Sequence, residues 1–337
     1  MPVRRTVAAL LVAFALTACA GGEGESEVPG ADASGSAATS GTGPAVTEPA
    51  APTATATPAP TTPPPPPPPV FDPAAAYETV RVLAEGIGPR EATSAAYAQA
   101  AATVGQRLTG LGYAVRTQEL AVPAGESWGV PVPAGTTVNV IAEPAGFDPA
   151  APHVVVGAHL DTVPQAPGAE DNASGVAIML ELARMTAQQP PAVPVVFVAF
   201  GAEEPRGPGD DLHHFGSQAY VAALGEPQRA ALRGMVSLDR AGVGDVVPVC
   251  YGGRGPSWLA EQLLAQGAVA GVPVSGVCQN RSSDHWSFER GGLVGARIGS
   301  TPYAGYHSPG DVPAVVDPAQ LDRSGRLVWS LLQSLTP

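Results

Sequence analysis

From Phe71 to the C-terminus, apolar runs typical of buried strands alternate with segments of helical periodicity. The run Val154–Ala158 is apolar throughout, as central strands of a parallel sheet are. Strands are predicted at residues 113–122, 137–143, 154–158, 193–200 and 234–238, and helices at 73–85, 94–111, 172–188, 217–224, 257–268 and 317–335. This alternation predicts an α/β fold, a three-layer α/β/α sandwich around a mixed, mostly parallel central sheet.

The first residues have the pattern of a targeting signal. Arg4 and Arg5 precede an apolar run that is too short for a membrane span of about 20 residues. The run ends in Leu16-Thr17-Ala18-Cys19, which resembles the bacterial lipobox, where cleavage precedes a cysteine that becomes lipidated. We therefore predict a lipoprotein-type signal peptide over residues 1–18 and lipidation of Cys19. The alternative is a plain secretory signal in which Cys19 is incidental.

Residues 19–70 are rich in Gly, Ser, Thr and Pro and contain almost nothing that could form a core. They are predicted to be a disordered linker that stiffens into polyproline II at residues 63–69. Such a linker would act as a spacer between a lipid anchor and a folded domain at residues 71–337.

The net charge of −13 and the pI near 4.8 argue against nucleic acid and against anionic membrane surfaces as partners. Contact with a membrane is expected only through the lipid anchor, in a protein that is exported and either attached to the cell surface or secreted. Cys250 and Cys278 remain in the exported part, where the oxidising surroundings favour a disulfide. Two buried thiols are the alternative, because sequence does not supply the distance between the two cysteines.

The predicted strands end in residues that can bind metal ions or move protons. His159 and Asp161 follow the strand at 154–158, Glu203 and Glu204 follow the strand at 193–200, and Asp239 follows the strand at 234–238. Since the carboxyl ends of parallel strands meet at one edge of a sheet, these side chains are expected to converge. Further candidates are Asp171 at the start of a helix and the loop residues Tyr306 and His307.

Two histidines and several carboxylates suit borderline divalent ions such as Zn²⁺, although other divalent metals fit the same residue types. Two ions about 3.5–4 Å apart need a bridging carboxylate, and Asp171 is the best placed. One ion would take His159 and Asp239, and the other would take Glu204 and His307.

The remaining residues of the cluster suit catalysis. Glu203 adjoins a ligand and could act as the general base that takes a proton from a metal-bound water, which then attacks the peptide as hydroxide, and could hand the proton to the leaving amine. The carboxylate of Asp161 could accept the second N–H of the His159 imidazole. Tyr306 could donate its hydroxyl to an oxyanion, and a packed aromatic ring is the alternative.

These motifs together resemble the M28 family of metallopeptidases, aminopeptidases with a co-catalytic zinc pair. The matching segments are Gly157–Asp161, Glu170–Gly175, Phe200–Glu204, Leu238-Asp239, Arg281–His285 and Tyr306–Asp311. The resemblance implies a zinc-peptidase-like fold and an exported, monomeric di-zinc aminopeptidase that acts on peptides with a free N-terminus. It implies five metal ligands (His159, Asp171, Glu204, Asp239, His307), Glu203 as base, Asp161 behind the first ligand and Tyr306 at the oxyanion. By weaker analogy it places Arg281 at the substrate-binding pocket.

One departure from the family pattern is the insertion at residues 205–215, between the Glu-Glu pair and Gly216-Ser217. It is expected to rim the site, with His213 and His214 as a solvated loop pair. Asp284 and His285 are expected to be structural or wall residues, and His153 is expected at the surface.

Three alternative functions remain. A carboxypeptidase-like M20 enzyme would separate its first His from the bridging Asp more widely, and glutaminyl cyclases use the fold with one zinc. A binding lipoprotein with a dead site would have no need of Glu203.

Overall fold

The computed structural model describes residue 43 and residues 67–337 of the chain. The predicted signal peptide, Cys19 and the linker up to residue 66, apart from residue 43, lie outside these residues. Within the described part, no helix combines the length and the apolar character needed to cross a bilayer.

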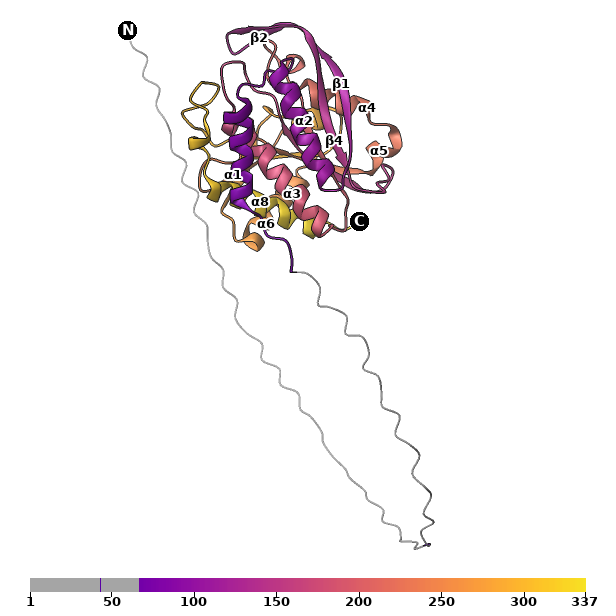
Figure 1. Ribbon diagram of the computed structural model, residues 1–337. Coiled ribbons are helices and arrows are strands. Elements are labelled where there is room, and N and C mark those ends of the chain that lie inside the picture. The colour runs from indigo at the N-terminus through magenta and orange to yellow at the C-terminus, as the bar shows by residue number, and fades with distance from the viewer. Residues whose placement is uncertain (1–42, 44–66) are drawn as a thin grey trace, which may run out of the picture. The chain divides into compact units, whose positions relative to one another are not determined.

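The described residues contain one large mixed sheet with the strand order β1-β4-β6-β5-β7-β10-β8-β9 (Figure 1). Its strands are β1 (Ala114–Val122), β4 (Gly135–Glu143), β5 (His153–His159), β6 (Val195–Phe200), β7 (Leu232–Leu238), β8 (Val247–Tyr251), β9 (Val274–Gln279) and β10 (Gly295–Ile298). The central pairs β6–β5, β5–β7 and β7–β10 are parallel, as is β8–β9 at one edge. The pairs β1–β4, β4–β6 and β10–β8 are antiparallel. The mixed, mostly parallel sheet predicted from the sequence is confirmed.

Helices cover both faces of this sheet. They are α1 (Pro73–Arg81), α2 (Ala95–Gly110), α3 (Gly175–Gln188), α4 (Phe215–Ala223), α5 (Glu226–Ala231), α6 (Trp258–Ala270), α7 (His285–Arg290) and α8 (Pro318–Ser334). On β5, Val154 and Val156 belong to the core shared with α1, α2, α3, α6 and α8, whereas Val155 belongs to the core shared with α4 and α7. Alternate residues of one strand thus enter opposite cores, which confirms the three-layer sandwich.

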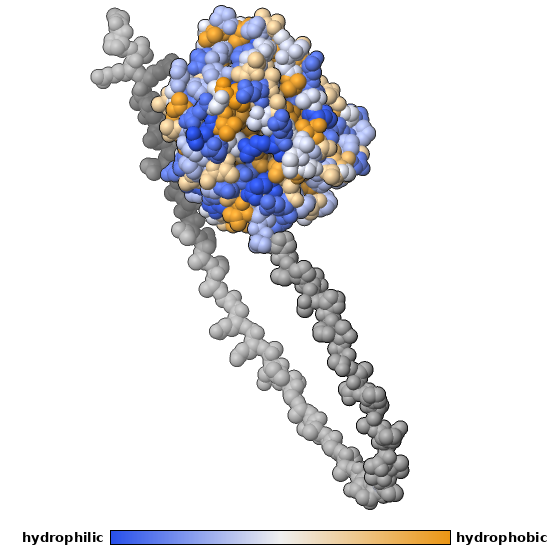
Figure 2. All heavy atoms as spheres, in the orientation of Figure 1, coloured by the Kyte–Doolittle hydropathy of each residue, from blue (hydrophilic) through white to orange (hydrophobic). Residues whose placement is uncertain are grey.

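Three of the helices begin where the sequence supplies a cap. The side chains of Asp72, Ser94 and Asp317 accept hydrogen bonds from the first backbone N–H groups of α1, α2 and α8. After α2 the chain turns at Gly112, whose φ of +90° favours glycine. The face of the folded unit in Figure 2 carries hydrophilic and hydrophobic residues side by side. The apolar residues of the central strands, such as Val154, Val155 and Val156 on β5, are buried in the interior.

Several short elements were not predicted. The π-helical turns Val82–Ile87 and Ala169–Ser174 overlap the predicted helices at 73–85 and 172–188. The elements without a predicted counterpart are the hairpin of β2 (Gly125–Ser127) and β3 (Val130–Val132), the strands β8, β9 and β10, the helices α5 and α7, and the 3₁₀ turns Asp210–Leu212 and Pro313–Val315. They have three to six residues each, too few to establish a periodicity.

Cys250 and Cys278 lie opposite each other on β8 and β9, and the structure joins them in a disulfide.

The expectation that His153 lies at the surface is wrong. It is the first residue of β5 and fully buried, with its ring edge-on to Phe147 at 5.1 Å between centroids.

Candidate active site

The carboxyl ends of the parallel strands deliver the predicted residues to one edge of the sheet. His159 is the last residue of β5, and Asp239 directly follows β7, its parallel neighbour. Glu203 and Glu204 follow β6 after Gly201 and Ala202. All four side chains line the same cleft together with Asp171 and His307. The convergence that the sequence predicted is therefore present.

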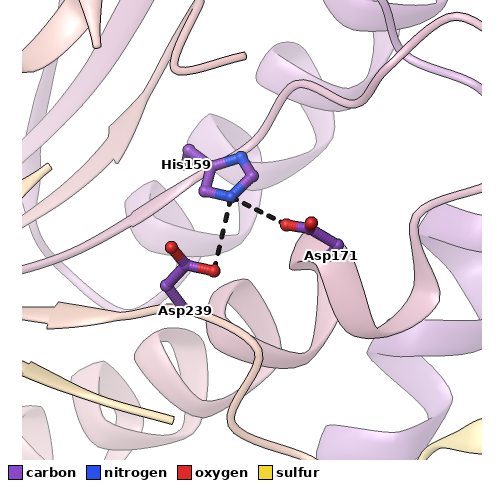
Figure 3. A group of neighbouring side chains, drawn as sticks. All are labelled: His159, Asp171 and Asp239. Atoms are coloured by element: carbon purple, nitrogen blue, oxygen red, sulfur yellow. Dashed lines mark ion pairs between the residues drawn. The ribbon is translucent and has the colours of Figure 1, made fainter. Parts of the chain in front are cut away.

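The first group consists of His159, Asp171 and Asp239 (Figure 3). The His159 Nε2 atom lies 3.1 Å from Asp171 Oδ1 and 3.7 Å from Asp239 Oδ1. All three residues are buried, and each offers one atom that lies within 4.8 Å of the other two. Arg297 supports the group from behind, with its fully buried guanidinium 3.0 Å from Asp239 Oδ2.

The second group consists of Asp171, Glu204 and His307. The His307 Nε2 atom lies 3.0 Å from Asp171 Oδ2 and 3.5 Å from Glu204 Oε1. These ligand atoms also lie within 4.8 Å of one another. Asp171 belongs to both groups and turns one carboxylate oxygen toward each histidine, as a bridging carboxylate would.

The backbone around Asp171 is not helical, which corrects the predicted helix start. Helix α3 begins at Gly175, because Asp171 and Asn172 have non-helical dihedral angles inside the turn Ala169–Ser174. The peptide bond between these two residues is cis. The carboxylate of Asp311 accepts hydrogen bonds from the backbone N–H groups of Glu170 and Asp171 at 2.8 and 3.1 Å. The Asn172 side chain donates to the Leu238 carbonyl. These contacts aim Asp171 at the two imidazoles.

The Asp161 carboxylate has a different role from the predicted one. The His159 Nδ1 atom contacts the backbone carbonyl of Asp161 at 3.1 Å, whereas the Asp161 carboxylate is 3.8 Å away. That carboxylate instead accepts the backbone N–H groups of Glu203 and Glu204 at 3.0 and 3.1 Å. Asp161 therefore orients His159 through its main chain and holds the Glu-Glu pair through its side chain.

The electrostatics of the cleft are those of a buried acidic cluster. Burial and neighbouring carboxylates raise the pKa of Glu203 and of Glu204 to about 8. Although burial lowers the pKa of His307, its ion pairs with Asp171 and Glu204 outweigh this effect and raise it to about 10. Burial also raises the pKa of Asp171, but the two imidazoles outweigh it and hold the pKa below the usual range. Carboxyl groups thus crowd the cleft, and the imidazoles of His159 and His307 are the partners of the shared Asp171 carboxylate.

The residues fit divalent cations. Asp239 Oδ1 and Glu204 Oε1, both buried, accept no hydrogen bond from any group that the structure describes. Buried carboxylate oxygens without donors are costly unless a cation compensates them. Imidazole and carboxylate donors in two groups of three are typical of zinc, and each group supplies one ligand fewer than the four of a tetrahedral site.

The other predicted residues lie in and around the cleft. Tyr306 lines it and stacks on the His307 ring at 3.7 Å between centroids. Arg281, expected at the substrate-binding pocket, does not line the cleft. Its Nε donates to the Gly252 carbonyl, and its guanidinium lies over the Trp286 ring.

The insertion at 205–215 rims the cleft as expected, through Pro205, His213 and His214. The expectation that His214 is solvated is wrong, because it is buried and its Nε2 lies 3.1 Å from Glu203 Oε1.

Two arginines next to the metal-binding groups, Arg297 and Arg240, were not predicted from the sequence. Adjacency to Asp239 was a signal for Arg240, but no local signal pointed to Arg297.

Comparisons with known proteins agree with this fold. Solved structures with the same fold include a zinc aminopeptidase from Bacillus subtilis, with a TM-score of 0.68, 21% identity, and coverage of 77% of this chain and 94% of that chain. A glutaminyl cyclase from Bacteroides thetaiotaomicron gives a TM-score of 0.66 at 20% identity, covering 80% of this chain and 99% of that chain. At these identities the likeness establishes the fold.

The sequence pattern of Peptidase family M28 matches residues 139–332, more than half of the chain. The chain belongs to peptidase family M28. Aminopeptidase YwaD of Bacillus subtilis is 32% identical over 187 residues, which are 52% of this chain and 39% of that protein. The probable lipoprotein aminopeptidase LpqL of Mycobacterium tuberculosis is 44% identical over 72 residues, 21% of this chain and 13% of that protein. The matches thus span half or less of these relatives.

Proposed function

We propose that this protein is an exported di-zinc aminopeptidase that removes N-terminal residues from peptides. The observation that carries the proposal is the shared Asp171 carboxylate, which faces His159 through one oxygen and His307 through the other. Membership of family M28 and the aminopeptidase names of its relatives support the same activity.

Two divalent ions would be held by this chain as follows. Asp171 would bridge them, with His159 and Asp239 on one ion and Glu204 and His307 on the other. When bound, zinc ions polarise a peptide carbonyl and lower the pKa of a water molecule, and they compensate the carboxylates that the structure leaves without donors.

Glu203 is the general base of the proposed mechanism. It lines the cleft beside the ligands, and burial keeps its pKa near neutrality, at about 8. A base of this pKa can take the proton of the attacking water and pass it to the leaving amine. The Asp161 carboxylate holds the Glu203 backbone and so positions this base.

Tyr306 is placed to stabilise the oxyanion. Its ring is held between the His307 ring, on which it stacks, and the Arg240 guanidinium, whose Cζ lies 4.4 Å from the ring centroid. A ring fixed in this way presents its hydroxyl in a defined direction. The free α-amine of the substrate would be bound by carboxylates of the cleft and by the metal ions.

Export and anchoring belong to the same proposal. A signal peptide over residues 1–18, a lipid on Cys19 and a spacer to residue 70 would tether a monomeric enzyme domain of residues 71–337 to the cell surface, and the likeness to LpqL supports this. Labelling cells with a clickable fatty acid tests it. Label that is absent, or that persists in Cys19→Ala, contradicts the anchor.

The activity is tested with the full chain, stripped of metal by a chelator and reloaded with Zn²⁺. We expect cleavage of aminoacyl-4-nitroanilides at close to two zinc ions per chain, and no cleavage by the metal-free protein. Zinc-loaded protein that cleaves none of a panel of such substrates would favour a binding function, and a single zinc per chain would favour a cyclase-like site.

A further inference from the structure

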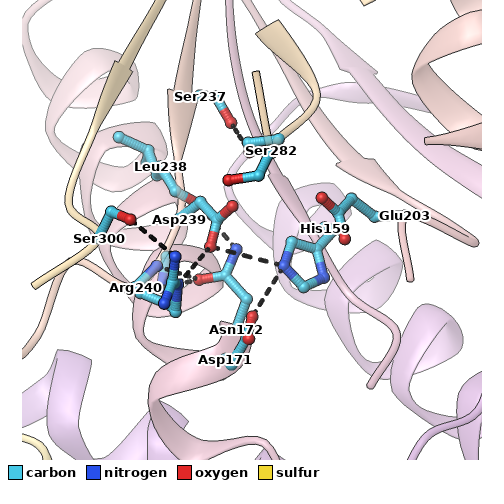
Figure 4. A network of polar contacts seen from close by, with 12 residues as sticks. His159, Asp171, Asn172, Glu203, Ser237, Leu238, Asp239, Arg240, Ser282 and Ser300 are labelled. Atoms are coloured by element: carbon cyan, nitrogen blue, oxygen red, sulfur yellow. Dashed lines mark hydrogen bonds and ion pairs between the residues drawn. The ribbon is translucent and has the colours of Figure 1, made fainter. Parts of the chain in front are cut away.

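One cationic side chain of the candidate active site has, in the mechanism above, only the part of packing against the Tyr306 ring. Among the described residues that line the cleft, Arg240 is the one arginine, and the chain contains no lysine. Figure 4 shows its guanidinium beside Asp239 and Ser300, in the same network of polar contacts as His159 and Asp171.

The backbone of Arg240 is held in a conformation that side chains adopt rarely. Its φ is +54°, and its N–H donates to the Asn172 side chain at 3.2 Å while its carbonyl accepts the N–H of Ser300 at 2.9 Å. Because both backbone groups are engaged, the direction of the side chain is defined. Non-glycine residues with a positive φ are uncommon, and those that hydrogen bonds fix in this conformation cluster at functional sites.

The guanidinium is anchored on one side and open on the other. Its Nη2 donates to Ser300 Oγ at 2.7 Å, and its plane lies over the Tyr306 ring. The side chain keeps 12% of its surface exposed, toward the cleft. A guanidinium has five N–H donors, and the Ser300 bond uses one of them.

Arg240 is not needed as the counter-ion of Asp239. That role is filled by Arg297, which is fully buried and 3.0 Å from Asp239 Oδ2, whereas Arg240 Nε is 3.8 Å from Asp239 Oδ1. In the proposed function a metal ion would also compensate the negative charge on Asp239 Oδ1. The free donors of Arg240 therefore remain available to a ligand in the cleft.

We propose that Arg240 is a specificity-determining residue that binds a carboxylate of the substrate close to the scissile bond. This inference rests on the proposed aminopeptidase function. The planar fork of a guanidinium matches a carboxylate in a bidentate arrangement. In a short peptide, a carboxylate near the first peptide bond comes either from an N-terminal Glu or Asp side chain or from the free C-terminus of a dipeptide.

The test compares substrates that differ only in this carboxylate. Glutamyl-4-nitroanilide against glutaminyl-4-nitroanilide reports the side chain, and Leu-Ala against Leu-Ala-amide reports the C-terminus. In at least one pair we expect the carboxylate form to have a kcat/KM about 10- to 100-fold higher, as charge-assisted hydrogen bonds provide. Ratios near one in both pairs would overturn the proposal.

Variants assign the preference to Arg240. Arg240→Met should bring the preferred ratio close to one at unchanged zinc content, with a larger loss of kcat/KM on the carboxylate substrate than on leucyl-4-nitroanilide, and Arg240→Lys should retain part of the preference. Arg254→Met, an exposed arginine outside the cleft, serves as the control. An equal loss on all substrates in Arg240→Met would show that Arg240 only positions Tyr306, and would overturn the proposal.

A binding measurement separates this proposal from the proposed function. Calorimetry of the zinc-loaded Glu203→Gln protein with glutamate, glutamine, Leu-Ala and Leu-Ala-amide measures binding without turnover. Tighter binding of glutamate than glutamine, or of Leu-Ala than its amide, that is lost in Arg240→Met supports carboxylate recognition even in a protein that cleaves nothing. Equal binding within both pairs contradicts it even in an active aminopeptidase.

Discussion

The two halves of the candidate metal site are built in different ways. His159 and Asp239 sit at the ends of β5 and β7, two paired central strands, with Arg297 on the neighbouring β10 behind them. Glu204 and His307 sit on loops. Glu204 lies two residues after Ala202, whose φ is +54°, and His307 itself has a φ of +52°, so both loops contain a residue in the left-handed region.

The surroundings of the two halves differ in the same sense. The ligands of the strand-borne half are all buried, whereas His307 in the loop-borne half is only partly buried and lies under Trp128, which is 54% exposed. The comparison teaches that, in the proposed di-zinc site, the sheet would preorganise one metal position and loops would form the other at the more exposed side of the site. Asp171 belongs to both halves, so substituting this residue tests whether the two halves depend on each other.

Asp171→Ala should have the largest effect, because it removes the ligand that both halves share. We expect loss of both zinc ions by elemental analysis and no detectable aminopeptidase activity. Asp245→Ala, an exposed aspartate, is the control and should keep both. Two ions retained in Asp171→Ala would show that the halves are independent sites.

Glu203→Gln should leave both halves intact and remove the proposed base between them. The amide keeps the size of the side chain but cannot accept the proton, so we expect kcat to fall by about 10²–10⁴-fold at unchanged zinc content. Loss of metal in this variant would instead make Glu203 a ligand.

Arg297→Met tests how the strand-borne half is supported. Removing the guanidinium leaves the buried Asp239 carboxylate without its nearest partner, which should lower the free energy of unfolding of the metal-free protein by about 3–5 kcal/mol. Urea unfolding measures this, and zinc should restore part of the loss because the ion also compensates Asp239. The surface variant Arg254→Met should stay within about 0.5 kcal/mol of the parent. A similarly small change in Arg297→Met would show that Asp239 is not stabilised by this pair.

The smallest expected effect is a difference in affinity between the two metal positions. The preorganised half should hold its ion about tenfold more tightly or more, so that a graded chelator titration removes zinc in two steps. His307→Ala should then retain one tightly bound ion, whereas His159→Ala should lose the tighter step. One-step removal, or the reverse pattern in the variants, would contradict the distinction between strand-borne and loop-borne ligands.

The sequence by itself determined the α/β sandwich, its long helices and strands, and the candidate metal ligands. The reason is local. Alternation and helical periodicity report which faces are buried, caps mark helix starts, and residues that follow parallel strands must meet at one edge of the sheet. His159, Glu204 and Asp239 could be located in this way without coordinates.

Only the tertiary structure decided what surrounds those residues. Arg297 reaches Asp239 from a strand 58 positions further along the chain, and the Asp161 carboxylate turns toward the backbone of Glu203 rather than toward His159. His214 is buried against Glu203, and Arg240 faces the cleft. Such contacts depend on the path of loops and on side-chain directions across the sheet, which no periodicity along the chain records.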